Sequence, residues 1–348
     1  MPRRLSLLLL LFSLALASCT GGEEPNANAP SERSVTVGDV VESHPLEDDM
    51  KILDSVAELV PLGGGRHLVQ DRSPSVALFE DYRMVRTYGA TGEGPCEYSG
   101  ISAIDTSGDS LFVLSANQAK VVTYHLETGE CLGESGNEAF ARRAYLERRG
   151  DAFYTARTYY VMGAADSTQV LFRIPDGGEA EPLELNVGAL DPVETPVTMV
   201  APGLNFLRRD NSLYAYYPFT DQMIRYDMNS GALDRFPLRV DIRREEITKA
   251  GENIDEIINI IQNNYQFVQH IVGGADWIAF SVAQQNGSDE NATMYVQFYE
   301  PDGSFIGEIE TEERMVAVED GRLVLLREAS DATAEHTYEL IYREVTVE

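Results

Sequence analysis

A β-hairpin that recurs along the chain constrains the fold more than any other feature of the sequence. Residues 108–129 (GDSLFVLSANQAKVVTYHLETG) and 210–231 (DNSLYAYYPFTDQMIRYDMNSG) align without a gap. The apolar alternation and both turns fall at the same places, and the identities are Ser110/Ser212, Leu111/Leu213, Tyr124/Tyr226 and Gly129/Gly231. Two copies that keep only their packing positions indicate a structural repeat.

Six segments in all fit this hairpin template, and apolar runs such as 56–62, 101–105 and 315–318 precede them. Four strands per unit make one propeller blade. The sequence therefore predicts an all-β, six-bladed β-propeller over residues 34–348. The sixth unit lacks an outer strand, so we expect residues 34–41 (SVTVGDVV) to pair with the last strand and close the ring.

The first 18 residues have the pattern of a signal peptide, with Arg3 and Arg4 before an apolar run and small residues at its end. The run is too short to span a bilayer as a mature helix. Leu16-Ala17-Ser18-Cys19 resembles the lipobox of bacterial lipoproteins, which implies a lipid-carrying Cys19 and a membrane partner. An ordinary secretory signal with an incidental cysteine is the alternative.

Residues 19–33 contain no apolar side chain larger than alanine or proline and cannot support a core, so we expect a disordered tether. Thr20, by its resemblance to known sorting rules, favours the outer membrane of the cell envelope. The Gly/Glu composition also resembles the acidic export signals of some surface-displayed lipoproteins, although it would suit any linker.

The chain is strongly acidic, with 57 Asp and Glu against 27 Lys and Arg and a net charge of −30. Nucleic acid is therefore a poor partner. Only three of the basic residues are lysines, Lys51, Lys120 and Lys249. High acidity with few lysines resembles halophilic proteins adapted to high salt, and a merely acidic surface domain is the alternative.

Cys96 and Cys131 are the other two cysteines. Export permits a disulfide between them. Two separate buried thiols are equally compatible with the sequence, since neither has a His or Lys neighbour that would mark a reactive thiolate.

Residues 89–98 (GATGEGPCEY) resemble the GxxGxGPGEF/Y signature of bacterial six-bladed propeller lipoproteins related to NHL repeats. The resemblance implies the propeller fold and an envelope address, but no particular chemistry. It also implies that Gly89, Gly92 and Gly94 form a loop needing positive φ or close backbone approach, and that Tyr98 wedges between blades. Cys96 stands where the family usually has glycine.

Long insertions are expected on one face of the ring, where the connection between the second and third strands of each blade and the crossover to the next blade emerge together. The four long segments of this kind are 157–167, 185–198, 241–266 and 283–292. Insertions gathered on one face mark the binding side of many repeat proteins. Residues 242–266 carry isoleucines at helical spacing, which predicts a helical insertion that acts as a lid or plugs the channel.

Aromatic and guanidinium side chains gather in these connections. We interpret six of them as candidate ligand-binding residues: Arg157, Tyr159, Tyr160, Tyr216, Tyr217 and Phe219. Aromatic rings stack on sugars and peptide side chains, and arginine binds carboxylates in a fork. Four residues begin or occupy equivalent connections and are weaker candidates: Arg72, Asn117, Gln284 and Arg327. All of these tyrosines could equally be blade filling.

Catalytic and metal-binding signatures are missing from the sequence. The five histidines are scattered without HExxH spacing, and no G-x-S-x-G elbow occurs. We therefore expect no catalytic residues, no metal and no cofactor.

The first hypothesis is a membrane-anchored recognition module that binds a glycan, peptide or partner protein on the insertion-bearing face. The second is a propeller enzyme of the lactonase, lyase or glycosidase kind, with a carboxylate or metal site at the channel mouth. The third is a scaffold in envelope assembly, which a contiguous apolar patch on the helix would support.

Overall fold

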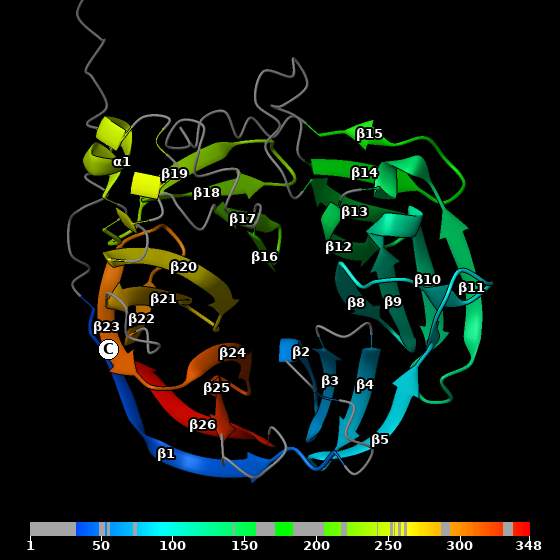
Figure 1. The fold of residues 1–348 in the computed structure, drawn as a ribbon, viewed down its shortest axis with the longest axis horizontal. Helices are drawn as coiled ribbons and strands as arrows, with labels where there is room; N and C mark the ends of the chain where they lie inside the picture. Colours follow the sequence, from blue (N-terminus) through cyan, green and yellow to red (C-terminus); the bar gives the residue numbers. More distant parts are fainter. Residues whose placement is uncertain are drawn as a thin grey trace, which may run out of the picture.

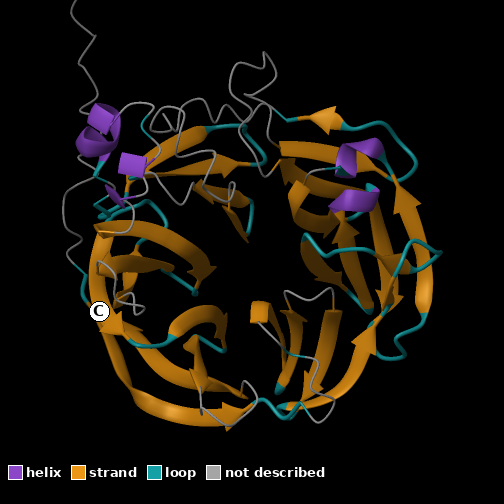
Figure 2. Cartoon of the chain, in the orientation of Figure 1, coloured by secondary structure: helices purple, strands orange, loops and turns teal. Residues whose placement is uncertain are grey.

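The computed structural model of the chain is a closed ring of six four-stranded antiparallel sheets (Figure 1), which confirms the predicted six-bladed β-propeller. The few helical turns lie outside the centre of the ring (Figure 2). The structure describes residues 33–48, 53, 56–71, 75–141, 143–157, 171–183, 205–216, 221–241, 243–250, 253, 255–256, 259–260, 263–286, 293–329 and 337–348.

The first three blades follow one another along the chain, each from its inner to its outer strand. Blade 1 is built from β2 (Val56–Gly63), β3 (Arg66–Asp71), β4 (Ser75–Glu80) and β5 (Arg83–Tyr88). Blade 2 is built from β8 (Ala103–Ser107), β9 (Ser110–Ser115), β10 (Lys120–His125) and β11 (Cys131–Gly136). Blade 3 is built from β12 (Arg143–Arg149), β13 (Ala152–Arg157), β14 (Leu171–Pro175) and β15 (Glu181–Pro182).

The other blades repeat the same order, except that the last one takes its outer strand from the N-terminus. Blade 4 is built from β16 (Asn205–Arg209), β17 (Ser212–Tyr216), β18 (Gln222–Asp227) and β19 (Leu233–Pro237). Blade 5 is built from β20 (Asn263–Gly273), β21 (Ile278–Asn286), β22 (Thr293–Tyr299) and β23 (Phe305–Thr311). Blade 6 is built from β24 (Arg314–Glu319), β25 (Arg322–Ala329), β26 (Thr337–Val347) and β1 (Val35–Pro45).

The ring is closed by the N-terminal strand, as the sequence predicted. β1 runs antiparallel to β26, with Val35 opposite Val347 and Pro45 opposite Glu339 (Figure 1). Ser34 and Glu348 exchange two backbone hydrogen bonds of 3.0 Å beyond the end of this ladder. Pairing the two ends removes the open edge that β26 would otherwise present.

The hydrophobic core lies between neighbouring blades, because each sheet buries both faces against its neighbours. The cluster between blades 1 and 2 shows the pattern: Leu68 and Val76 come from blade 1, and Leu111 and Val113 come from blade 2. Tyr98, 1% exposed, packs in this same cluster and donates its hydroxyl hydrogen to the Tyr88 carbonyl. The expected wedge between blades is therefore present.

The two copies of the repeat superimpose in their register. Tyr124 lies opposite Leu111, and Tyr226 lies opposite Leu213. The closing glycines Gly129 and Gly231 have φ of 71° and 72°, a conformation that favours glycine at the end of a tight turn.

The loop between blades 1 and 2 uses its glycines in two ways. Gly89 has a φ of 71°, and a Cβ at this position would collide with the rings of Tyr98 and Tyr124. A Cβ at Gly92 would collide with the Glu97 carboxylate, so this glycine allows a close approach. Cys96 itself has a φ of 61°, which is the conformation expected of the glycine that the signature usually has there.

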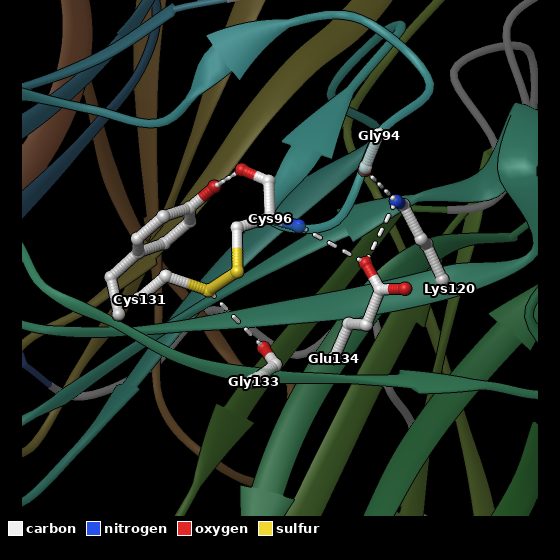
Figure 3. Close-up of a disulfide and its surroundings, with 7 residues drawn as sticks. Gly94, Cys96, Lys120, Cys131, Gly133 and Glu134 are labelled. Carbon is white, nitrogen blue, oxygen red and sulfur yellow. Dashed lines mark hydrogen bonds and ion pairs between the residues drawn. A yellow bond between two sulfur atoms is a disulfide. The ribbon is translucent and has the colours of Figure 1, made fainter.

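Cys96 and Cys131 form a disulfide, so the structure selects the first of the two alternatives that the sequence left open. The bond ties the loop to the first residue of β11, with 6.1 Å between the two Cα atoms (Figure 3). Beside it, Glu134 accepts the backbone N–H of Cys96 at 3.2 Å and pairs with Lys120 at 2.9 Å. Covalent and polar contacts together fix this loop to the outer edge of blade 2.

The continuous helix expected over 242–266 is not confirmed. The described residues contain α1 (Arg244–Ala250) and separate helical residues near 255 and 259, and β20 already begins at Asn263. The prediction was wrong for its last four residues, since pairing of Asn263 with Asn286 extends the inner hairpin of blade 5. A ladder to a neighbouring strand overrides the local helical prediction for these residues. Within the described residues, no helix has the length and apolar character needed to cross a membrane.

The strand order puts the ends of all four long segments on one face. The β13–β14 and β21–β22 connections join second to third strands, and the β15–β16 and β19–β20 connections are crossovers between blades. Because strands in a blade alternate in direction, connections of these two kinds leave the same end of the ring.

Candidate functional site

The inner strands surround a cavity of about 800 Å³ on the axis of the ring. Its lining comes from β2, β8, β12, β16 and β20, with Tyr216 from β17. Ser102 and Asn205 line it at the end that carries the long connections, and Asp210 lines it near the turn at the opposite end. The cavity therefore extends along the axis of the ring, and it is the candidate functional site.

Two carboxyl groups on adjacent inner strands face this cavity. Glu58 lies in β2 and Asp105 lies in β8. Burial raises the pKa of Glu58 to about 7, and the nearby Asp105 contributes to the same direction. Burial also raises the pKa of Asp105 to about 6, although its carboxylate accepts the backbone N–H of Arg148. Both groups therefore titrate near neutral pH.

A third carboxylate in the cavity already has a partner. Glu147 of β12 forms an ion pair with Arg208 of β16, which joins blades 3 and 4. Tyr145, two residues earlier and on the same side of the strand, donates to Glu147 at 2.8 Å. Burial, followed by the charge of Glu147, raises the pKa of the Tyr145 hydroxyl well above its usual range.

Two further side chains complete the wall. The Tyr216 hydroxyl is buried without a hydrogen-bond partner, and its ring packs edge-on against Phe280 with 5.5 Å between centroids. His270 has its Nε2 atom 3.1 Å from the Val316 carbonyl. Burial lowers the pKa of His270 to about 4, so its ring is neutral at physiological pH.

The described residues contain no group of three or more His, Cys, Asp and Glu arranged to hold a metal ion. What the cavity offers is a set of organic hydrogen-bonding groups: two carboxyls near their pKa, a buried ion pair and two tyrosines. Such a set can bind a polar ligand, and a carboxyl with a raised pKa can also serve as a general acid.

The residues predicted from the connections lie in different parts of the structure. Tyr216 is the last residue of β17 rather than part of a loop, its side chain is fully buried, and it lines the cavity. Arg157 is the last residue of β13. Tyr159, Tyr160, Tyr217 and Phe219 lie outside the described residues, so their proposed role stays a prediction.

The weaker candidates are engaged within the ring where they are described. Asn117 lies in the 3-10 turn η1 (Ala116–Gln118). Gln284 accepts a hydrogen bond of 3.1 Å from Gln266, and Arg327 pairs with Glu313 at 2.6 Å and with Glu339 at 3.0 Å. Arg72 lies outside the described residues.

Sequence reasoning missed the charged residues of the cavity, which are Glu58, Asp105, Glu147 and Arg208 on the inner strands and Asp210 in the turn after β16. A signal exists for Glu58 and Asp105, because each is a charged residue inside a short apolar run, 56–62 or 101–105, that precedes a predicted hairpin. Both faces of such a strand pack against neighbouring blades, and the strand itself borders the axis, so a charged residue there is expected beside the channel. The sequence-based prediction places the site in the connections instead, where binding residues are more common.

A comparison with models of protein families identifies the family of this chain. Residues 56–236 match the family DUF5128, described as a 6-bladed beta-propeller. The chain belongs to this family. The match spans blades 1 to 4, and blades 5 and 6 continue the same architecture.

Solved structures share the fold at low sequence identity. An exported protein from Bacteroides fragilis aligns with a TM-score of 0.62 and 13% identity, over 92% of this chain and 97% of that one. BamB from Moraxella catarrhalis aligns with a TM-score of 0.42 and 12% identity, over 88% of this chain and 100% of that one. The propeller domain of Cps50 (Swd1) from Myceliophteria thermophila aligns with a TM-score of 0.45 and 11% identity, over 89% and 100%. No curated protein matches the chain.

Proposed function

We propose that this protein is a membrane-anchored recognition propeller of the cell envelope, which binds a glycan, peptide or partner-protein segment in its central cavity. Cleavage before Cys19 and lipidation of this cysteine would place the ring on a membrane at the end of the 19–33 tether. The outer membrane, with exposure at the cell surface, is the proposed location. The structural likeness to an exported protein is compatible with this address.

The single observation that carries the binding function is the chemistry of the cavity wall. About 800 Å³ is within the size range of small-ligand sites, and the wall combines apolar strand residues with a few converging polar groups. The cavity also reaches Ser102 and Asn205, at the end of the ring that carries the long connections. Those connections, with Arg157, Tyr159, Tyr160, Tyr217 and Phe219, would extend the contact surface around its mouth.

An enzymatic function is the second candidate, and one observation favours it. Burial raises the pKa of Glu58 to about 7, whereas Glu147 is ion-paired with Arg208, so the cavity contains two carboxyl groups in different electrostatic environments. Pairs of this kind divide acid and base roles in glycosidases and lyases. The third hypothesis, a scaffold docking through the helix, depends on isoleucines whose side chains lie outside the described residues.

The test is to incubate the mature chain, from residue 19 onward, with glycan and peptide arrays at low and high salt. We expect capture of one ligand class, with the affinity changed by Arg208→Gln, which leaves Glu147 in the cavity wall without its ion-pair partner. Conversion of a captured ligand to product would favour the enzyme. Failure to capture any ligand under all conditions would contradict the recognition function.

The anchor is tested separately by expressing the full chain and Cys19→Ser in a bacterium with lipoprotein processing. We expect the wild type in the membrane fraction with an acylated N-terminal cysteine by mass spectrometry, and the variant in the soluble fraction. Equal partition of the two chains would contradict lipidation.

A further inference from the structure

We propose that the ligand of the central cavity carries an organic cation, an ammonium or guanidinium group, which lies between Glu58 and Asp105. This inference rests on the proposed function, because it names the chemical class bound at the same site. It follows from three features of the wall: its charge balance, an unused hydroxyl group and its aromatic surface.

The cavity lacks a countercharge for two of its carboxyl groups. Among the described residues that line it, Arg208 is the one Lys or Arg, and it is already paired with Glu147. Within the described part of the chain, no hydrogen bond or ion pair involves the side chain of Glu58, and Asp105 accepts only backbone N–H groups. A half-buried carboxylate without a cation is partly desolvated and uncompensated, and a bound cation would relieve this cost.

In the part of the chain that the structure describes, no neighbouring group supplies the missing charge. His270, from β20, is neutral above about pH 4 and has its Nε2 atom 3.1 Å from the Val316 carbonyl. Tyr145, from β12, donates to Glu147. Arg314, at the start of β24, donates to the Val56 carbonyl at 2.6 Å. The groups that face Glu58 and Asp105 from the packed strands are therefore neutral or already paired.

An independent observation also indicates a ligand. Tyr216 also lines this cavity, and its fully buried hydroxyl has no hydrogen-bond partner among the described residues. A buried polar group left unpaired costs about 1–3 kcal/mol, so such groups need an explanation. A bound N–H donor would satisfy this oxygen.

The wall also offers aromatic rings to a cation. Tyr145 and Phe206 both line the cavity, with ring centroids 5.0 Å apart. Ammonium and guanidinium groups are attracted to aromatic faces. A bare metal ion fits less well, because the described residues contain no metal-binding cluster and the cavity is far larger than an ion. The excess of carboxyl groups over cations would repel anions.

A pH dependence follows from this arrangement. A cation beside Glu58 and Asp105 favours their ionised forms, so binding releases protons wherever these groups are protonated in the free protein. Since Glu58 titrates near pH 7 and Asp105 near pH 6, affinity should rise as the pH increases from 5 to 8. Linkage predicts an increase of about tenfold or more over this range.

The experiment is isothermal titration calorimetry of the mature chain with three probes: L-arginine amide and cadaverine as cations, and glucose as a neutral control. We expect the cations to bind more tightly at pH 8 than at pH 5, with proton release shown by a dependence of the binding heat on buffer. Glu58→Gln and Asp105→Asn should each weaken cation binding about tenfold or more at pH 8.

The matched control is Asp39→Asn, which makes the same change of charge on an exposed residue of β1 at the ring perimeter. It should leave cation affinity unchanged, which separates a local effect from the effect of net charge. Circular dichroism melts of all variants verify that each ring is folded.

The outcomes separate the two proposals. Cation affinity that is equal in the wild type, Glu58→Gln and Asp105→Asn would overturn the proposed cation site. Capture of a neutral glycan or an acidic peptide in the array, with no binding of either cation, would overturn the ligand class and leave the recognition function intact. Absence of any binding in both experiments would overturn both.

Discussion

At the residue scale, the inner strands place charged side chains beside the central cavity, where partial desolvation lowers the stability of the folded ring. Glu58 interrupts an apolar run and faces the axis, where burial makes its carboxylate unfavourable. The folded protein therefore binds more protons at Glu58 than the unfolded chain does between about pH 4.5 and pH 7. The stability of the ring should fall as the pH rises through this window.

Glu58→Gln tests this cost without ligand. The amide cannot ionise, so we expect the variant to match the wild type at pH 4 and to melt about 2–4 °C higher at pH 8. Thermal unfolding at both pH values measures the difference, with Asp39→Asn as the exposed control. A variant less stable than the wild type at pH 8 would show that Glu58 has a stabilising partner.

Two buried tyrosines provide a second test at this scale. Tyr98 donates its hydroxyl hydrogen to the Tyr88 carbonyl, whereas the Tyr216 hydroxyl has no partner. Tyr98→Phe should therefore cost about 1–2 kcal/mol, and Tyr216→Phe should be neutral or stabilising in the absence of ligand. Chemical denaturation of both variants measures this contrast, and an equal loss in the two would contradict it.

At the scale of elements, the loop between blades 1 and 2 and the insertion between blades 4 and 5 are held in different ways. The first is tied covalently to β11 by the Cys96–Cys131 disulfide. The second is closed at its base by hydrogen bonds, since Gln266 N–H donates to the Asp241 carbonyl at 3.2 Å. We therefore expect loss of the disulfide to destabilise the ring and excision of the insertion to leave it folded.

Loss of the disulfide should destabilise the ring. The bond closes a loop between positions 35 residues apart, and the chain-entropy account then gives about 3–4 kcal/mol. We expect the double variant Cys96→Ser/Cys131→Ser to unfold at lower denaturant concentration. Dithiothreitol should shift the wild type toward the variant and leave the variant unchanged. Coincident unfolding curves would show that the bond does not stabilise the fold.

Excision of the insertion should leave the ring folded. Asp241 and Gln266 are neighbours in space, so a Gly-Ser link replacing 243–262 can join the two blades and keep β20 from Asn263 onward. We expect cooperative unfolding to persist while ligand capture changes. Loss of cooperative unfolding in this deletion would show that the segment is part of the core rather than a cover over the mouth.

At the scale of the whole molecule, the ring depends on contact between its two ends. β1 and β26 are each eleven residues long, and their pairing joins the first described residues of the chain to its last. Beside this seam, the buried His67 of blade 1 bonds Glu319 of blade 6 at 2.9 Å and Tyr342 at 3.1 Å. Polar and apolar contacts therefore both cross the closing interface.

Deleting residues 34–45 should open the ring. β26 would then present a free strand edge, so we expect a marked fall in melting temperature and self-association that increases with protein concentration. Analytical ultracentrifugation and thermal melts measure both effects, with deletion of residues 20–32 as the control for shortening the N-terminus. A monomer of unchanged stability would contradict the role of β1 in closure.

The sequence by itself determined the architecture, because a blade is specified by local alternation and turns that repeat along the chain. The register of Tyr124 with Leu111, the glycine turns at 129 and 231, and the closing strand from residue 35 were all predictable in this way. The extent of the helix over 242–266 was not predictable in this way, because its last residues pair with β21 as part of β20.

Only the tertiary structure decided where the candidate site lies. Glu58, Asp105, Glu147 and Arg208 come from four different blades, and each pair of neighbours is tens of residues apart in the chain. Their shared cavity, the pairing of Glu147 with Arg208 and the unpaired Tyr216 hydroxyl exist only once the ring closes. Local patterns encode which face a side chain takes, whereas charge balance in a cavity depends on distances that the closed ring alone sets.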